Sequence, residues 1–231
     1  MSKKHFIQEL SQDWNFGVYP LLLEVTRKSF SIRPLRGPAF LISVRERAFA
    51  STVCTLAAFQ AESMLQNIAY KKGKKDDSRH ELVKLICNLK LQQAVLELFI
   101  MRDVIAHSHL HKTIINFKQD GDPKSSYSKK VRGYDSKDYK LLVVRNKTKL
   151  LQFNVAPSRI GFTDSVLALI LSNRLAKELG ITTKDFYIHK ITEDGGYQSI
   201  KLTDYIKFLT QGLNNSHKNS LQRKLAFVNK V

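Results

Sequence analysis

One short segment of the chain gathers side chains that can move protons and hold a phosphate. Arg102-Asp103-Val104-Ile105-Ala106-His107 is followed by His109 and His111, so three of the seven histidines lie within five residues. An imidazole can take or donate a proton near neutral pH, and a guanidinium can hold a phosphate and stabilise the charge that it gains during cleavage. Arg102 and His107 are therefore candidates for metal-free cleavage of RNA.

Helical geometry leaves the arrangement of these two residues open. Five residues correspond to about 140° of rotation, so Arg102 and His107 do not share one helical face. Either the helix end frays, or a second chain supplies an Arg and a His across a two-fold axis. His109, seven residues after Arg102, returns to the face of the arginine and is the second candidate. His107 and His111 could form a metal pair, but no third ligand is evident nearby, so no metal site is predicted.

Two long helices are predicted to position the segment. The capping box Ser43-Val44-Arg45-Glu46 begins a helix that should end just before Gly73, and Ser78-Arg79-His80-Glu81 begins a second that should end at 107–110. The second helix would be about 45 Å long, and the short loop between the two requires an antiparallel pair. Residues 94–101 are apolar almost all round, so a larger bundle or a subunit partner should cover them.

Shorter elements are predicted for the rest of the chain, and Gly or Pro separates several of them. In chain order we expect a helix near 21–30, a strand at 113–117, a basic loop at 118–139, strands at 141–145 and 150–155, a helix at 164–179 with Thr163 as its cap and Gly180 as its stop, a hairpin around 194–196, a helix near 204–213 and a basic tail.

The chain is strongly basic. Its 38 Lys and Arg against 20 Asp and Glu give a formal net charge of +18, which favours nucleic acid first and an anionic membrane second as partners. We find no apolar run long enough to span a membrane, no signal core and no glycine-rich phosphate loop. The two cysteines, Cys54 and Cys87, lie in apolar stretches. We therefore expect a cytoplasmic protein without disulfides, cofactor or membrane contact.

Positive charge is most concentrated at 124–149, where nine basic residues face two aspartates. Lysines can follow phosphates, and Tyr127, Tyr134 and Tyr139 could stack on unpaired bases, although a solvated surface loop would have the same composition. The residues predicted to contact RNA are Lys124, Lys129, Lys130, Arg132, Tyr134, Lys137, Lys140, Arg145, Lys147 and Lys149.

The motif from Arg102 to His107 resembles the Arg-x4–6-His signature of HEPN domains, in which a polar residue, here Asp103, commonly follows the arginine. The resemblance covers roughly 43–112 and extends at most to the helix at 164–179. It implies a mainly α fold, a HEPN-like helical bundle built on a long antiparallel helix pair. Residues 113–160 would be a smaller strand-containing basic insertion or accessory region, between an N-terminal part at 1–112 and C-terminal elements at 161–231 on the same core.

The resemblance also implies an activity. HEPN proteins with this motif are typically metal-independent endoribonucleases that act as homodimers, in which the two Arg–His pairs meet at the dimer interface. For this chain it implies that Arg102 and His107 are catalytic. A role in toxin–antitoxin, abortive-infection or other antiviral defence systems would follow, with an acidic antitoxin as a possible regulatory partner.

Supporting residues and rival interpretations remain open at this point. Glu62 lies among apolar residues of the first helix and either orients Arg102 or His107 or faces solvent, while Asp103 and His109 could support the pair. We expect substitutions of Arg102 and His107 to leave the fold intact, as polar interface groups. The rivals are a non-catalytic basic RNA-binding protein, in which the motif is structural, and a regulatory module that binds an acidic partner.

Overall fold

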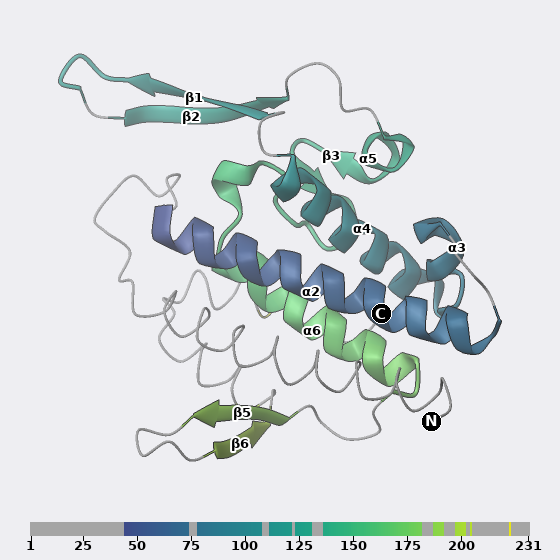
Figure 1. Cartoon of the computed structure of the whole chain (residues 1–231). Coiled ribbons are helices and arrows are strands. Elements are labelled where there is room, and N and C mark those ends of the chain that lie inside the picture. Colours follow the sequence, from purple (N-terminus) through teal and green to yellow (C-terminus); the bar gives the residue numbers. More distant parts are fainter. Residues whose placement is uncertain are drawn as a thin grey trace.

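The computed structural model describes residues 44–73, 78–107, 111–121, 123–130, 136–181, 187–191 and 197–201, together with Asp204 and Gln222. This part of the chain is mainly helical, as predicted, and its longest helices are α2 (Val44–Lys71), α4 (Leu89–Ala106) and α6 (Phe162–Glu178). Helix α2 packs against both of the others, with α4 antiparallel to it and α6 parallel to it (Figure 1). These three helices form the scaffold on which the motif lies.

Helix α2 ends where the sequence predicts. Its last residue is Lys71, and Gly73 has a φ of +75°, the left-handed conformation that glycine adopts readily after a helix. The predicted cap Ser43 lies outside the described residues. The carboxylate of Glu46 accepts a hydrogen bond from Phe162 N at 3.1 Å, so the first turn of α2 also holds the start of α6.

The prediction of one continuous second helix is wrong, because the chain leaves helical geometry at residues 84–88. A short helix, α3 (Arg79–Val83), begins as predicted, with the Ser78 hydroxyl accepting from Glu81 N at 3.4 Å. Asn88 then starts a new helix, since its side-chain oxygen accepts from the amides of Lys90 and Leu91 at 3.0 and 3.1 Å. The predicted 45 Å helix is therefore α3, a link and α4.

The link between α3 and α4 carries one of the two cysteines. Cys87 is exposed in the link, whereas Cys54 is buried in α2. Gln92 fixes the link from the first turn of α4, because its side-chain amide donates to Ile86 O at 2.7 Å.

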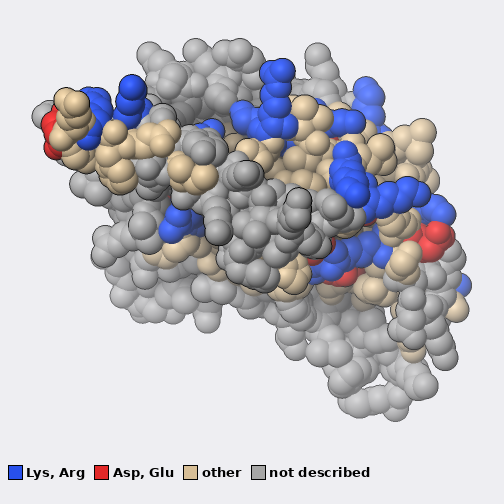
Figure 2. Space-filling model, turned by 90° about the horizontal axis from the view of Figure 1, so that it is seen from above, with Lys and Arg blue, Asp and Glu red and all other residues tan. Residues whose placement is uncertain are grey.

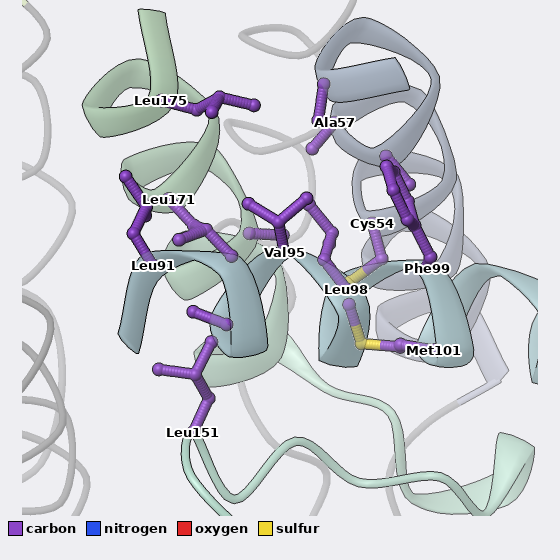
Figure 3. Packing of buried hydrophobic residues seen from close by; sticks show 14 of the residues in the cluster. Cys54, Ala57, Leu91, Val95, Leu98, Phe99, Met101, Leu151, Leu171 and Leu175 are labelled. Atoms are coloured by element: carbon purple, nitrogen blue, oxygen red, sulfur yellow. The ribbon is translucent and has the colours of Figure 1, made fainter. Parts of the chain in front are cut away.

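Helix α4 is covered on almost every side by its own chain. Figure 3 shows its side chains packed among those of α2, α6 and the segment that contains Leu151. A second cluster joins Ile100 and Val104 of α4 to Tyr139 and Leu142 of helix α5 (Lys137–Leu142) and to Val155. A larger bundle within one chain therefore covers 94–101, and residues 139–155 share the core with the helices.

A fully buried carboxylate ties the chain at 150–151 to the middle of α4. Glu97 is 0% exposed, and its two oxygens accept hydrogen bonds from Leu150 N at 2.7 Å and Leu151 N at 2.8 Å. Gln93, one turn earlier, donates to the same carboxylate at 3.2 Å. These bonds satisfy the charge inside the core.

Three antiparallel strand pairs occur in the described part of the chain: β1 (His111–Phe117) with β2 (Pro123–Lys130), β3 (Val143–Val144) with β4 (Lys147–Thr148), and β5 (Tyr187–Ile191) with β6 (Tyr197–Lys201). The predicted strand at 113–117 is confirmed, and β5 and β6 flank the predicted hairpin around 194–196. The predicted loop at 118–139 is wrong, because 123–130 pairs with β1.

The two strands predicted at 141–145 and 150–155 are mostly wrong. Residues 141–142 end α5, and only 143–144 are extended in a strand. In the second segment a single bridge joins Asn154 to Lys147. The backbone amides of residues 150 and 151 donate to the Glu97 carboxylate, so they are not available for hydrogen bonds to a neighbouring strand.

Helix α6 begins earlier than predicted. Gly161 is its N-cap, in place of Thr163, and the Asp164 carboxylate accepts from Gly161 N and from Asn154 N, each at 3.0 Å. The predicted stop is confirmed, since Gly180 has a φ of +65°. The predicted helix near 21–30, most of the one near 204–213 and the basic tail lie outside the described residues. No helix in the described ranges is long and apolar enough to cross a bilayer.

Candidate functional site

Two arginines and two carboxylates form a closed ring where α2, α3 and α4 meet. Arg102 Nη1 donates to Glu62 Oε2 at 2.9 Å, and Arg102 Nε donates to Asp103 Oδ1 at 3.0 Å. Arg79 Nε donates to the other oxygen of Glu62 at 3.2 Å, and Arg79 Nη1 donates to the other oxygen of Asp103 at 2.8 Å. Each carboxylate is shared by both guanidinium groups. We call these four residues the charge ring; their formal charges cancel.

Two aromatic rings flank the charge ring. Phe59 of α2 lies against the guanidinium of Arg102, with 5.3 Å between Cζ and the ring centroid. Phe99 of α4 lies against Arg79 at 5.6 Å. Both distances are within the range of cation–π attraction, so the arginines are held by ring faces as well as by carboxylates.

The charge ring is buried at one corner and open at another. The side chain of Arg102 is 9% exposed and that of Arg79 is 37% exposed, with the carboxylates between these values. Arg102 is thus a buried group of its own chain, and the expectation that it is a polar interface residue outside the core is wrong. Burial opposes the charge on Arg79, but Asp103 and Glu62 outweigh it and raise the pKa of that guanidinium.

Of the two interpretations of Glu62, the structure favours contact with Arg102. The residue that the sequence reasoning did not find is Arg79. One signal could have indicated it, because Arg79 occupies the first position of α3. The positive end of the helix dipole disfavours a cation there. A cation at an unfavourable helix position suggests that it is held for another purpose.

His107 lies exposed at the end of α4. Its backbone amide donates to Asp103 O at 2.9 Å, and its φ and ψ of −107° and 38° depart from the helix. The buried Arg102 and the exposed His107 do not converge on one helical face, since the helix is regular between them. His109, the second candidate, lies outside the described residues.

The predicted RNA-contacting residues divide into three groups. Those with described, exposed side chains are Lys124, Lys137, Lys140, Arg145, Lys147 and Lys149. Lys129 and Lys130 lie on β2, and Arg132 and Tyr134 lie outside the described residues. Tyr139 is only 8% exposed and packs in the core, so the prediction that it could stack on a base is wrong.

Five of these cations lie close together in sequence on α5, β4 and the turns beside β4: Lys137, Lys140, Arg145, Lys147 and Lys149, here called the basic segment. Its single acid, Asp138, lies 2.8 Å from His80 Nε2 through its Oδ2. Two consecutive residues with positive φ, Arg145 and Asn146, make the turn between β3 and β4. Figure 2, which views the molecule from the side of the β1–β2 hairpin, shows Lys and Arg spread over this face with few acids.

The described residues hold no group of three or more His, Cys, Asp or Glu side chains arranged to bind a metal ion. Comparison with known proteins adds no relative: no family model, curated protein or solved structure matches the chain. The resemblance to HEPN domains accordingly depends on the motif at 102–107 and the helical pair that carries it.

Proposed function

We propose that the chain is a metal-independent endoribonuclease that acts as a homodimer, with Arg102 and His107 as the pair on which cleavage depends. The observation that carries the proposal is the charge ring next to an exposed histidine. Two guanidinium groups are fixed by shared carboxylates at the end of α4, and His107 lies one turn beyond Asp103. A fixed guanidinium and an imidazole that can take and donate a proton can together cleave RNA without a metal.

The proposed reaction is a transesterification within the RNA. His107 takes the proton of a 2′-hydroxyl, and the 2′-oxygen attacks the neighbouring phosphorus, so a P–O2′ bond forms. The P–O5′ bond breaks, and the 5′-oxygen takes a proton from the imidazolium of the second copy. The products are a 2′,3′-cyclic phosphate and a 5′-hydroxyl. A guanidinium of the charge ring stabilises the charge on the phosphorane oxygens.

The basic segment supports RNA as the substrate. Five exposed cations with one paired acid make a local surplus of positive charge, in a chain whose formal net charge is +18. Such a surface attracts the RNA backbone irrespective of base sequence and gives binding that weakens as salt rises. A defence or toxin role, with an acidic antitoxin as inhibitor, belongs to the same proposal through the HEPN resemblance.

The experiment that tests the proposal is a cleavage assay on mixed tRNA and structured RNA in the presence of EDTA. The parent protein should cleave and leave cyclic phosphate ends, and His107→Ala should abolish cleavage. Lys72→Ala, which changes an exposed residue after α2, is the matched control and should cleave like the parent. Sedimentation should give about twice the chain mass of 26.5 kDa.

Other outcomes would select a different function. Cleavage only after addition of a divalent metal would rule out the proposed mechanism. Salt-sensitive RNA binding that survives Arg102→Ala and His107→Ala, with no cleavage by the parent, would identify a non-catalytic RNA-binding protein. An absence of RNA affinity together with tight association with an acidic protein would identify a regulatory module.

A further inference from the structure

The face of α4 that carries His107 also carries Asp103. These two residues are four apart, and side chains four apart on a helix are neighbours on one face. Arg102 lies about 140° away from His107 around the axis. A guanidinium that reaches Asp103 from another helix can therefore lie on the same face of α4 as His107. Arg102 lies on a different face.

Arg79 is such a guanidinium. It reaches Asp103 Oδ2 from α3 through Nη1 at 2.8 Å, and Glu62 Oε1 through Nε at 3.2 Å. Among the described residues its remaining nitrogen, Nη2, has no hydrogen-bond partner, and the side chain is 37% exposed. Two of its three nitrogens are thus fixed, and the third still has two N–H groups to donate.

Arg102 is placed differently. Its Nε and Nη2 both contact Asp103 Oδ1, its Nη1 contacts Glu62, and its side chain is 9% exposed. Every nitrogen of its guanidinium therefore already contacts a carboxylate, whereas within the described part of the chain Arg79 keeps one nitrogen without such a contact. Arg102 is thus well placed to orient the carboxylates and poorly placed to touch a substrate.

We propose that Arg79 is the residue of the charge ring that binds the scissile phosphate, on the face of α4 that ends in His107, and that Arg102 is a positioning residue. This inference deepens the proposed function and depends on it for the identity of the phosphate. Arg79 donates through Nη2 to a non-bridging phosphate oxygen while Glu62 and Asp103 hold its plane. Because the guanidinium is already ordered, little side-chain freedom is lost on binding.

The test compares Arg79→Gln and Arg79→Lys with the parent protein and with the control Lys72→Gln. One measurement is cleavage of RNA in EDTA. The other is the salt dependence of binding to a single-stranded 2′-O-methyl RNA, which cannot form the cyclic phosphate. We expect Arg79→Gln to lower kcat about 100-fold, as for loss of one donor to a developing oxyanion, and to reduce the slope of log K against log salt by about 0.7.

Arg79→Lys keeps the formal charge of the ring. It therefore tests the inference even if Arg79→Gln does not fold. It should cleave well below the parental rate, because an ammonium cannot hold two carboxylates and a phosphate in the same plane. The double variant Glu62→Gln with Arg79→Gln restores a neutral ring without the donor, and it should stay as slow as Arg79→Gln. Recovery of cleavage in the double variant would show that Arg79 acts only by balancing charge, and would overturn the inference.

The two measurements separate this inference from the proposed function. If the parent does not cleave RNA but Arg79→Gln reduces the slope of log K against log salt, the proposed ribonuclease activity is wrong and the phosphate contact of Arg79 is supported. If both Arg79 variants match the parent and Lys72→Gln in cleavage and in salt slope, Arg79 does not bind phosphate. Cleavage that tolerates both Arg79 variants but not a folded Arg102→Lys would assign the contact to Arg102.

Discussion

Glu62 and Arg102, forty residues apart in sequence, meet at 2.9 Å between Oε2 and Nη1 and join α2 to α4. The opposite oxygen of the same carboxylate holds Arg79, so one acid connects three helices. The contact places an acid of the first helix and an arginine of the motif in a single structural unit. That unit has consequences for stability as well as for chemistry.

Arg102→Met should destabilise the protein by about 3 kcal/mol, the lower limit for breaking a buried ion pair, because the two carboxylates keep Arg79 and are themselves partly exposed. Chemical denaturation measures the change. Lys149→Met, at an exposed position, is the matched control and should change the free energy of unfolding by less than about 0.5 kcal/mol. Equal effects of the two substitutions would contradict a structural role for the charge ring.

Glu97→Gln should lower the free energy of unfolding by about 2 kcal/mol. The two backbone amides of Leu150 and Leu151 each donate to a separate oxygen of Glu97, and a glutamine side chain has only one acceptor oxygen. Urea unfolding of the purified variant provides the measurement. Gln93→Ala removes only the 3.2 Å bond to the same carboxylate and should cost clearly less. If the order of the two effects were reversed, the anchoring of residues 150–151 by Glu97 would be disproved.

The stability of the fold should fall above about pH 9 because of Cys54. Burial, and then the charge of Asp164, raise the pKa of this thiol well above its ordinary value of 9.0. In the unfolded chain the thiol loses its proton near that pH, whereas the folded protein keeps it, so the unfolded form binds fewer protons and is favoured as pH rises. The Cys54 contribution approaches about 1.4 kcal/mol per pH unit.

The pH effect is isolated by comparing Cys54→Ala with the parent in denaturation series at pH 8 and pH 10. The variant should lose less stability between the two pH values. Cys87→Ser, which changes the exposed cysteine, should follow the parent. A parental pH dependence retained in full by Cys54→Ala would show that other groups cause it.

Replacing Lys137, Lys147 and Lys149 together by Gln should weaken binding to single-stranded RNA and reduce the slope of log K against log salt by about 0.7 for each phosphate that the variant no longer neutralises. Fluorescence anisotropy titrations at several salt concentrations give the slope. Replacing Lys71, Lys72 and Lys90 by Gln removes the same charge from exposed positions elsewhere. An equal fall in slope for both sets would mean that RNA recognises net charge and not the basic segment.

Local signals in the sequence predict the helices where a cap or a glycine defines an end. Gly73 and Gly180 end α2 and α6 in the left-handed conformation, as predicted, and Ser78 begins α3. The break before α4 is not predictable in this way, because Asn88 is an ordinary polar residue within a helical pattern. It becomes a cap only because residues 84–88 leave the helix, and that depends on how α3 packs.

Long-range contacts cannot be predicted from the sequence by the same means. Glu97 is one acid in an apolar run, and its partners are backbone amides more than fifty residues later. Arg79 meets Asp103 across 24 residues. The motif at 102–107 is visible in the sequence, but which arginine is open to solvent depends on the packing of three helices.

The exposed Cys87 between α3 and α4 allows site-specific labelling of the protein. The only other cysteine, Cys54, is 0% exposed, so one thiol per folded molecule should react with a maleimide dye. A dye at that position sits next to the helix that carries Arg79. A change in its emission on addition of RNA would therefore report binding near α3, without any engineered residue.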